Sequence, residues 1–322
     1  MTNFRKDPLY NRWVLMVPGR GKRPHAFYRE KEKDDGKVCP FCEGREEKTP
    51  PEIDSFRVKG KANEPGWKIR VVPNKYPALT RELKIGWVSK GLFQSIKGYG
   101  THEVIIETPS HSKTLYNMDE EEISLIFKMY RKRTIILKED KNLKYIFIFK
   151  NYGRIAGASF PHSHSQILGL PLIPPFVEEE IKRISDSLNC IYCHLILKAK
   201  EDRRILTKNS DFIALAPYAS LVPYQITVFP LEHKPYFEEI SDVEINSLSR
   251  IIKEIFQRYN KILRAPAFNF FIHTFPRDKR CKNYHYHLQI MPKLTLQAGF
   301  EMGSGIFINP VPPKTAIREL KS

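Results

Sequence analysis

The segment HSHSQ at residues 162–166 recurs as HYHLQ at residues 285–289, and this recurrence decides the fold. In a β-strand alternate side chains share a face, so each segment places two histidines and a glutamine on one face of a strand. A Cys-x-x-Cys pair and a further histidine precede each segment. The spacing from His111 to His162 is 51 positions, and that from His233 to His285 is 52. The sequence therefore predicts two copies of one unit.

The flanks of the two segments follow one plan. Each copy has an apolar strand (104–107 and 225–229), then a helix, then a second apolar strand (145–149 and 268–272). Capping boxes that pair Asn117 with Glu120 and Ser241 with Glu244 are expected to open the helices. We expect an α+β fold, a duplicated unit of mostly antiparallel sheet with flanking helices. The predicted domains are residues 1–175 and 176–322.

Composition limits the class of protein. The chain has 322 residues, of which 41% are hydrophobic and 28% charged, and this excludes a disordered, collagenous or disulfide-rich protein. No apolar run is long enough for a transmembrane helix, and the first residues lack the apolar core of a secretory signal. A cytoplasmic protein without membrane contact is expected.

The net charge of +17 suits nucleic acid or phosphorylated metabolites. The positive excess is spread along the chain, and no RNA-binding signature is present. A basic surface around a phosphate-ester site is therefore favoured. A zinc-stabilised nucleic-acid-binding protein is the alternative from another class, and it predicts a steep salt dependence of polynucleotide binding.

Four of the five cysteines form two Cys-x-x-Cys pairs, which in a cytosolic protein indicate metal or redox chemistry. The first pair lies in a loop-like stretch rich in Pro, Gly and charge, so metal is favoured over a thioredoxin-type site. With two histidines each, the pairs would form saturated four-ligand sites, which are structural because no position is left for water. The predicted zinc ligands are Cys39, Cys42, His111 and His162 at the first site, and Cys190, Cys193, His233 and His285 at the second.

His164 remains as the candidate nucleophile of the first copy. A neutral imidazole attacks phosphorus and forms a covalent phosphoramidate. The loop at 151–159 (NYGRIAGAS) brings small residues and Ser159 close enough for backbone contact with a phosphate. Gln166 is placed to donate a hydrogen bond to a phosphoryl oxygen. The repeat by itself leaves His164 and His287 both open as nucleophile, and the small-residue loop favours His164.

A further anion-binding cluster is expected in VPGRGKRP at residues 17–24, where Arg20 and Arg23 lie between prolines. Cys281 lies in a basic loop and is interpreted as a free thiol. His25, His102 and His194 are interpreted as ordinary buried or surface histidines.

Taken with WVLMVPGRGKRP, CPFCEGREEKTPPEI, RVVPNKYPAL, HSKTL and GFEMGSG, the run NYGRIAGASFPHSHSQI resembles the galactose-1-phosphate uridylyltransferases of the histidine-triad superfamily. The resemblance extends over about residues 8 to 312. It implies a duplicated histidine-triad fold, a homodimer and a ping-pong reaction. His164 would attack the α-phosphorus of a nucleotide sugar and release hexose 1-phosphate, and the nucleotidyl group would pass to a second phosphate acceptor.

The resemblance also assigns residues. It makes His162 a metal ligand and places Gln166 on the transferred phosphoryl group. Arg20 and Arg23 would reach phosphates across the dimer interface. The remaining substrate contacts that it implies are Asn151, Gly157 and Ser159 at the phosphates, Asn74 at the nucleoside, and Phe300 and Glu301 at the sugar.

The chain departs from the uridylyltransferase pattern at two points. Ser163 replaces the proline that many members have between the two histidines. The second Cys-x-x-Cys replaces a Glu and histidine set, so His273 competes with His233 as a ligand and iron is an alternative to zinc there. These features and the GFEMGSG tail resemble the ADP-glucose phosphorylases, which transfer an adenylyl group to inorganic phosphate. We rank UDP-hexose exchange with hexose 1-phosphate first, adenylyl transfer second, and a nucleotide hydrolase as a further alternative.

Overall fold

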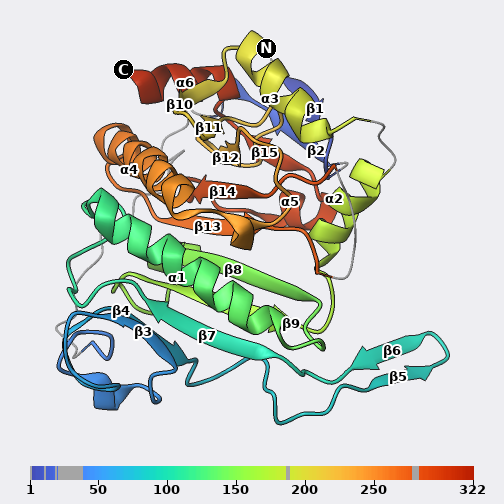
Figure 1. Ribbon diagram of the computed structural model, residues 1–322. Coiled ribbons are helices and arrows are strands. Elements are labelled where there is room, and N and C mark those ends of the chain that lie inside the picture. The colour runs from blue at the N-terminus through green and yellow to red at the C-terminus, as the bar shows by residue number, and fades with distance from the viewer. Residues whose placement is uncertain (1, 11, 19, 21–38, 186–188, 278–282) are drawn as a thin grey trace.

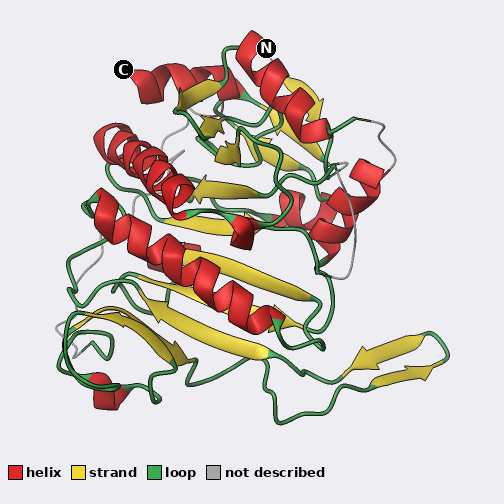
Figure 2. Cartoon of the chain, viewed as in Figure 1, coloured by secondary structure: helices red, strands yellow, loops and turns green. Residues whose placement is uncertain are grey.

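The computed structural model of the 322-residue chain describes all residues except 1, 11, 19, 21–38, 186–188 and 278–282. A mostly antiparallel sheet with helices on it confirms the expected α+β class. Figure 2 shows that strands make up the centre of the molecule. In the described part of the chain, no helix has the length and apolar character needed to cross a membrane.

One sheet of ten strands contains both copies of the unit, and each copy contributes five of them. Its two halves have matching orders, β3-β4-β7-β9-β8 and β10-β11-β12-β14-β13, and they meet where β8 pairs antiparallel with β13. The strands of the first half are β3 (Asp54–Arg57), β4 (Trp67–Pro73), β7 (Thr101–Ile106), β8 (Tyr145–Tyr152) and β9 (His164–Leu170). Those of the second half are β10 (Ile205–Lys208), β11 (Phe212–Leu215), β12 (Ile226–Pro230), β13 (Phe268–His273) and β14 (His287–Pro292).

Two long helices, α1 (Glu120–Lys138) and α4 (Asp242–Leu263), lie side by side on one face of this sheet (Figure 1). Apolar residues at helical spacing, such as Ile123 and Phe127, pack with Ile148 and Ile167 of the strands into the largest core cluster. Because side chains alternate along β9, His164 and Gln166 face away from these helices. The helices thus stiffen the back of the sheet and leave the other face for chemistry.

The remaining elements border the sheet. A small sheet consists of β1 (Asn3–Lys6), β2 (Trp13–Met16) and β15 (Phe307–Asn309), and β5 (Trp87–Lys90) with β6 (Phe93–Ile96) forms a projecting hairpin (Figure 1). The shorter helices are α2 (Pro175–Ser185), α3 (Ile191–Glu201), α5 (Gly299–Ser304) and α6 (Pro313–Lys321). Short 3-10 turns occupy Glu46–Lys48, Arg154–Ala156 and Phe237–Glu239.

The start of the second long helix is confirmed and that of the first is corrected. Ser241 and Glu244 form the expected capping box. Helix α1 instead has Asp119 as its N-cap, with Glu122 completing the box. Asn117 is not available for capping because its side chain holds the preceding turn, accepting from the Thr114 amide and donating to the Ser112 carbonyl.

The two copies share a continuous sheet, so the division at 175/176 remains an interpretation of the repeat. The histidine-containing strand is also shorter than expected. Strand β9 begins at His164, so His162 lies two residues before it and its side chain joins a cluster outside the strand.

Candidate active site and metal centres

The His164 ring is held in one tautomer by the backbone. Its Nδ1 lies 2.8 Å from the His162 carbonyl oxygen, which can only accept, so Nδ1 carries the proton and the neutral ring has its lone pair on Nε2. His164 is 7% exposed, and burial lowers the pKa of its ring below the ordinary value of 6.5. A neutral imidazole with a free Nε2 lone pair is the form required of a nucleophile.

The expected phosphate-binding loop follows β8 and is tied to the second copy. Gly153 and Gly157 have φ of 82° and 89°, which favour glycine and let the loop turn tightly. Asn269 on β13 donates from one amide nitrogen to both Asn151 Oδ1 and the Ala156 carbonyl, each at 2.8 Å. Ser159 is exposed at the end of the loop.

The H-x-H-x-Q residues of each copy are called its triad, which is His162, His164 and Gln166 in the first copy and His285, His287 and Gln289 in the second. Asn74, the residue expected to contact the nucleoside, lies beside Gln166. Its Nδ2 is 3.4 Å from Gln166 Oε1, and its Oδ1 accepts from the Tyr76 amide at 2.8 Å. The second bond fixes which end of the Asn74 amide faces Gln166. Asn74 and Gln166 come from distant parts of the sequence, and the sheet brings them together.

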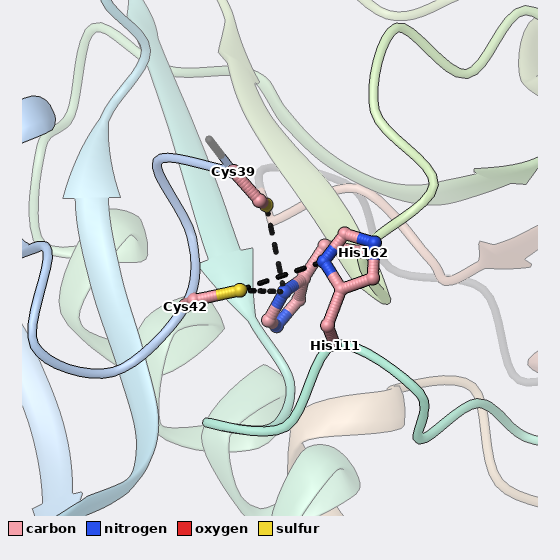
Figure 3. A group of neighbouring side chains, drawn as sticks. All are labelled: Cys39, Cys42, His111 and His162. Carbon is pink, nitrogen blue, oxygen red and sulfur yellow. Dashed lines mark hydrogen bonds between the residues drawn. The ribbon is translucent and has the colours of Figure 1, made fainter. Parts of the chain in front are cut away.

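The four ligands predicted for the first metal site converge from three segments (Figure 3). Cys42 Sγ lies 3.5 Å from His111 Nδ1 and 3.6 Å from His162 Nδ1, and Cys39 Sγ lies 3.7 Å from the same His162 atom. His162 Nε2 bonds the Thr108 carbonyl at 2.7 Å, which leaves Nδ1 directed at the sulfurs. The donor set fits a thiophilic metal such as zinc.

The second cluster repeats this arrangement with Cys190, Cys193, His233 and His285. Cys193 Sγ lies 3.6 Å from His233 Nδ1 and 4.0 Å from His285 Nδ1, and His285 Nε2 bonds the Pro230 carbonyl at 2.8 Å. Burial is the main cause that raises the pKa of the Cys190 thiol to about 11, so a cation is needed to hold its thiolate. This donor set also fits zinc.

A third group separates His273 from the second cluster. His273 and His287 both lie against Glu180, with His273 Nδ1 at 3.1 Å from each carboxylate oxygen and His287 Nε2 at 3.3 Å from Oε1. His233 thus lies with the cysteines of the second cluster, and His273 does not. Burial would raise the pKa of Glu180, but the two histidines lower it, so the group contains a carboxylate.

The second copy has no free nucleophile at its triad. His287 Nε2 lies 3.3 Å from Glu180 Oε1 and 3.2 Å from Gln289 Nε2, and the side chain is 1% exposed. Tyr10, from the N-terminal segment, donates to Glu180 and accepts from Gln289 Nε2 at 2.9 Å, which closes the site. For His164, by contrast, no residue in the described part of the chain bonds Nε2.

Three of the predicted substrate residues make no hydrogen bond or ring contact with His164 among the described residues. Arg20 follows β2 and is exposed, and Phe300 and Glu301 lie on α5, where Glu301 caps its own helix by accepting from the Ala298 amide. Arg23 and Cys281 lie outside the described residues.

Sequence reasoning missed the buried support behind the triad. Lys150 Nζ lies 2.6 Å from Glu107 Oε2, 2.9 Å from Ser163 Oγ and 3.0 Å from the His164 carbonyl. Glu107 also accepts from Ser163 and Tyr130. The signal was a lysine at an inward-facing position of an apolar strand, which requires a buried partner.

The chain is similar to known proteins over its full length. A family described as galactose-1-phosphate uridyl transferase, N-terminal domain, matches residues 1–174, and a domain of unknown function matches residues 107–321. An ADP-glucose phosphorylase from Arabidopsis thaliana is 36% identical, covering 99% of this chain and 92% of the relative. A galactose-1-phosphate uridylyltransferase from Thermotoga maritima is 29% identical, covering 100% of this chain and 98% of the relative.

The fold agrees with a solved structure. The crystal structure of an ADP-glucose phosphorylase from Arabidopsis thaliana with bound ADP-glucose superposes with a TM-score of 0.85 at 35% identity, covering 100% of this chain and 98% of that one. That protein binds a nucleotide sugar.

Proposed function

The chain belongs to the galactose-1-phosphate uridyl transferase family, and from this premise we propose that it is an ADP-glucose phosphorylase. Both named relatives transfer a nucleotidyl group, and the chain is a nucleotidyltransferase. The 36% identity to the phosphorylase, against 29% to the uridylyltransferase, favours adenylyl transfer over the UDP-hexose exchange ranked first from the sequence. Uridylyl transfer remains the second candidate because that relative matches the chain from end to end.

The observation that carries the proposal is the state of His164. Its Nε2 lone pair has no partner among the described residues, while Nδ1–H is bonded to the His162 carbonyl. In the proposed reaction Nε2 attacks the α-phosphorus of ADP-glucose, the bond from phosphorus to the bridging oxygen breaks, and glucose 1-phosphate leaves. The His162 carbonyl then stabilises the positive charge that develops on the ring. An oxygen of inorganic phosphate attacks the adenylyl-histidine, which yields ADP and restores His164.

Other residues support the transfer. Gln166 would donate its amide hydrogen to the α-phosphoryl oxygens as negative charge grows there. The amides of the loop that contains Gly157 and Ser159 would bind the phosphates, and Asn151 is held by Asn269 for the same purpose. Asn74 would contact the nucleoside. These roles rest on the family resemblance.

We further propose zinc at both Cys2His2 clusters. When bound there, zinc would stabilise the loops and supply no chemistry at phosphorus, because both donor sets are saturated. Iron remains the alternative at the second cluster.

A homodimer is proposed because Arg20, Phe300 and Glu301 are implied substrate contacts that do not touch their own triad. Mixing His164→Asn with Glu301→Ala tests this, since a hybrid dimer in which each protomer supplies what the other lacks would recover activity. A mixture that is no more active than the two variants measured separately would argue against a shared site.

The experiment that tests the function is intact-protein mass after brief incubation with ADP-glucose or UDP-glucose, without an acceptor. An adenylyl adduct in the wild type and none in His164→Asn would support the phosphorylase, and a uridylyl adduct would support the second candidate. Chasing the adduct with phosphate, galactose 1-phosphate or water alone then identifies the acceptor. Turnover with water as the only acceptor would indicate a hydrolase, and no adduct from either sugar would refute the covalent mechanism.

A further inference from the structure

His102 lies on β7 beside the triad glutamine. Its Nε2 is 2.6 Å from Gln166 Oε1 and 3.2 Å from Asn74 Nδ2, and its Nδ1 is 3.1 Å from the backbone nitrogen of Ala78. Nothing in the sequence pattern distinguishes His102 from an ordinary histidine. Its place on the sheet does, because the residue two positions later, Val104, is paired directly with Gln166.

The backbone amide of Ala78 determines which nitrogen of His102 carries the proton. An amide N–H can only donate, so Nδ1 of His102 must offer its lone pair. A neutral imidazole that accepts at Nδ1 is protonated at Nε2. The short contact at Nε2 is therefore an N–H donated to the oxygen of the Gln166 amide.

That bond fixes the orientation of the Gln166 amide. The oxygen is taken by His102, with Asn74 Nδ2 as a second, longer donor at 3.4 Å. The nitrogen end of the amide is then the end left for a ligand, and no residue in the described part of the chain accepts from it. An amide flipped the other way would turn an oxygen toward a phosphate and repel it.

The second copy carries the same device with a different side chain. Gln225 is the equivalent of His102, two positions before Thr227, which is paired with Gln289. Gln225 Nε2 lies 3.2 Å from Gln289 Oε1, and Gln225 Oε1 accepts from the Leu221 amide at 2.7 Å. In both copies a backbone N–H fixes the accepting end of a side chain, whose donating end then fixes the triad glutamine.

We propose that His102 is a positioning residue that holds the amide of Gln166 with its nitrogen toward the phosphoryl group being transferred. The inference rests on the proposed nucleotidyl transfer and deepens it. His102 does not touch phosphorus. It acts through Gln166, so it should matter when charge develops on the phosphoryl oxygens and not when the nucleotide sugar first binds.

The test uses two matched variants and one background. His102→Gln introduces the side chain that the second copy has at this position, and it keeps a donor where Nε2 lies. His102→Asn keeps an acceptor near Nδ1 but cannot reach Gln166. Each is made in the wild type and in Gln166→Leu, and the single-turnover rate of adenylyl-His164 formation is measured against ADP-glucose concentration, with melting temperature as a check on folding.

We expect His102→Asn to slow adduct formation by roughly tenfold to a hundredfold, in line with a misplaced catalytic group, without changing the half-saturating ADP-glucose concentration. His102→Gln should recover most of the rate. In Gln166→Leu, which is itself slow, His102→Asn should have no additional effect because the group it positions is gone. An equal loss in both backgrounds, or a loss in His102→Gln as large as in His102→Asn, would overturn the proposal.

The tautomer gives a second test that does not depend on activity. Long-range ¹H–¹⁵N NMR of the histidine rings, assigned by comparison with His102→Gln, should find His102 protonated at Nε2 only. Protonation at Nδ1 would overturn the inference and leave the proposed function intact. A wild-type protein that forms no adduct with ADP-glucose or UDP-glucose would instead refute the proposed function.

Discussion

His287 Nε2 lies 3.3 Å from a carboxylate oxygen of Glu180, a residue that is completely buried. The equivalent atom of His164 has no such neighbour among the described residues, and the two triads of the duplicated chain therefore differ in chemistry although they share a sequence pattern. A nucleophile needs an accessible lone pair, whereas Nε2 of His287 is enclosed by the Glu180 carboxylate and the Gln289 side chain.

The first prediction follows from this difference. His164→Asn should abolish formation of the nucleotidyl adduct, and His287→Asn should still form it. Because His287→Asn leaves Glu180 with one partner fewer in a buried site, it should lower the melting temperature more than His164→Asn does. Intact mass spectrometry and thermal unfolding of both variants check this. A nucleotidyl group mapped by peptide sequencing to His287 would contradict it.

The second prediction concerns the ion pair behind the triad. Lys150 is fully buried and bonds Glu107, Ser163 and the His164 carbonyl. Lys150→Met leaves Glu107 charged and unpaired in the core, so it should cost about 3–5 kcal/mol of unfolding free energy. Urea unfolding measures the loss.

Two controls make that measurement specific. Lys68→Met removes an exposed pair with Glu121 and should leave stability nearly unchanged. The double variant Lys150→Met/Glu107→Leu removes both charges and should recover part of the loss. A double variant less stable than Lys150→Met alone would show that the pair itself is not what stabilises this region.

The same pair predicts how stability depends on acid. Burial would raise the pKa of Glu107, but Lys150 and hydrogen bonds from Ser163 and Tyr130 lower it below the ordinary value of 4.5. The unfolded chain then binds the proton first as pH falls. The contribution of Glu107 is complete above pH 4.5 and is lost as pH falls through its folded pKa.

We therefore expect the wild type to be more stable than Glu107→Gln at neutral pH, with the difference shrinking below pH 4.5. Urea unfolding of both proteins across that range measures it. Other carboxylates titrate in both proteins and cancel in the comparison. A difference that stays constant with pH would mean that Glu107 is not ionised in the folded protein.

Much of this architecture could be predicted from local signals. Apolar strands, the Ser241 capping box and the spacing of the two H-x-H-x-Q segments all arise from short-range chemistry, and the α+β class followed from them. The predicted start of α1 was wrong because Asn117 and Asp119 can both serve as N-caps. Only the turn at Thr114, which engages the Asn117 side chain, decides between them. The joining of both copies in one sheet depends on the β8–β13 pairing, which no local pattern specifies.

The candidate site likewise has a part that could be predicted from the sequence and a part that could not. Ligands repeated at matched spacing could be predicted, and the structure brings each set of four together. The roles of Glu180 and Lys150 could not, because the partners that define them lie 13 to 170 positions away in the sequence and only the fold brings them into contact. His102 was hidden for another reason, since its counterpart in the second copy is a glutamine and the repeat was sought by identity.

The last prediction separates the two metal centres. Cys42→Ser and Cys193→Ser should each lower the bound zinc, measured by elemental analysis, by one ion per chain, because each removes a thiolate from a different four-ligand set. A metal present at about a thousand times its Kd stabilises the fold by about 4 kcal/mol, so both variants should have a lower melting temperature.

The effects of the two variants on adduct formation should differ. At the proposed first centre His162 would be a ligand, and its carbonyl accepts from Nδ1 of His164, so Cys42→Ser should slow the reaction of His164. Cys193→Ser acts in the copy without a free nucleophile and should leave that rate close to wild type at a temperature where the protein is folded. Equal slowing by both variants would show that the second centre also supports the active site.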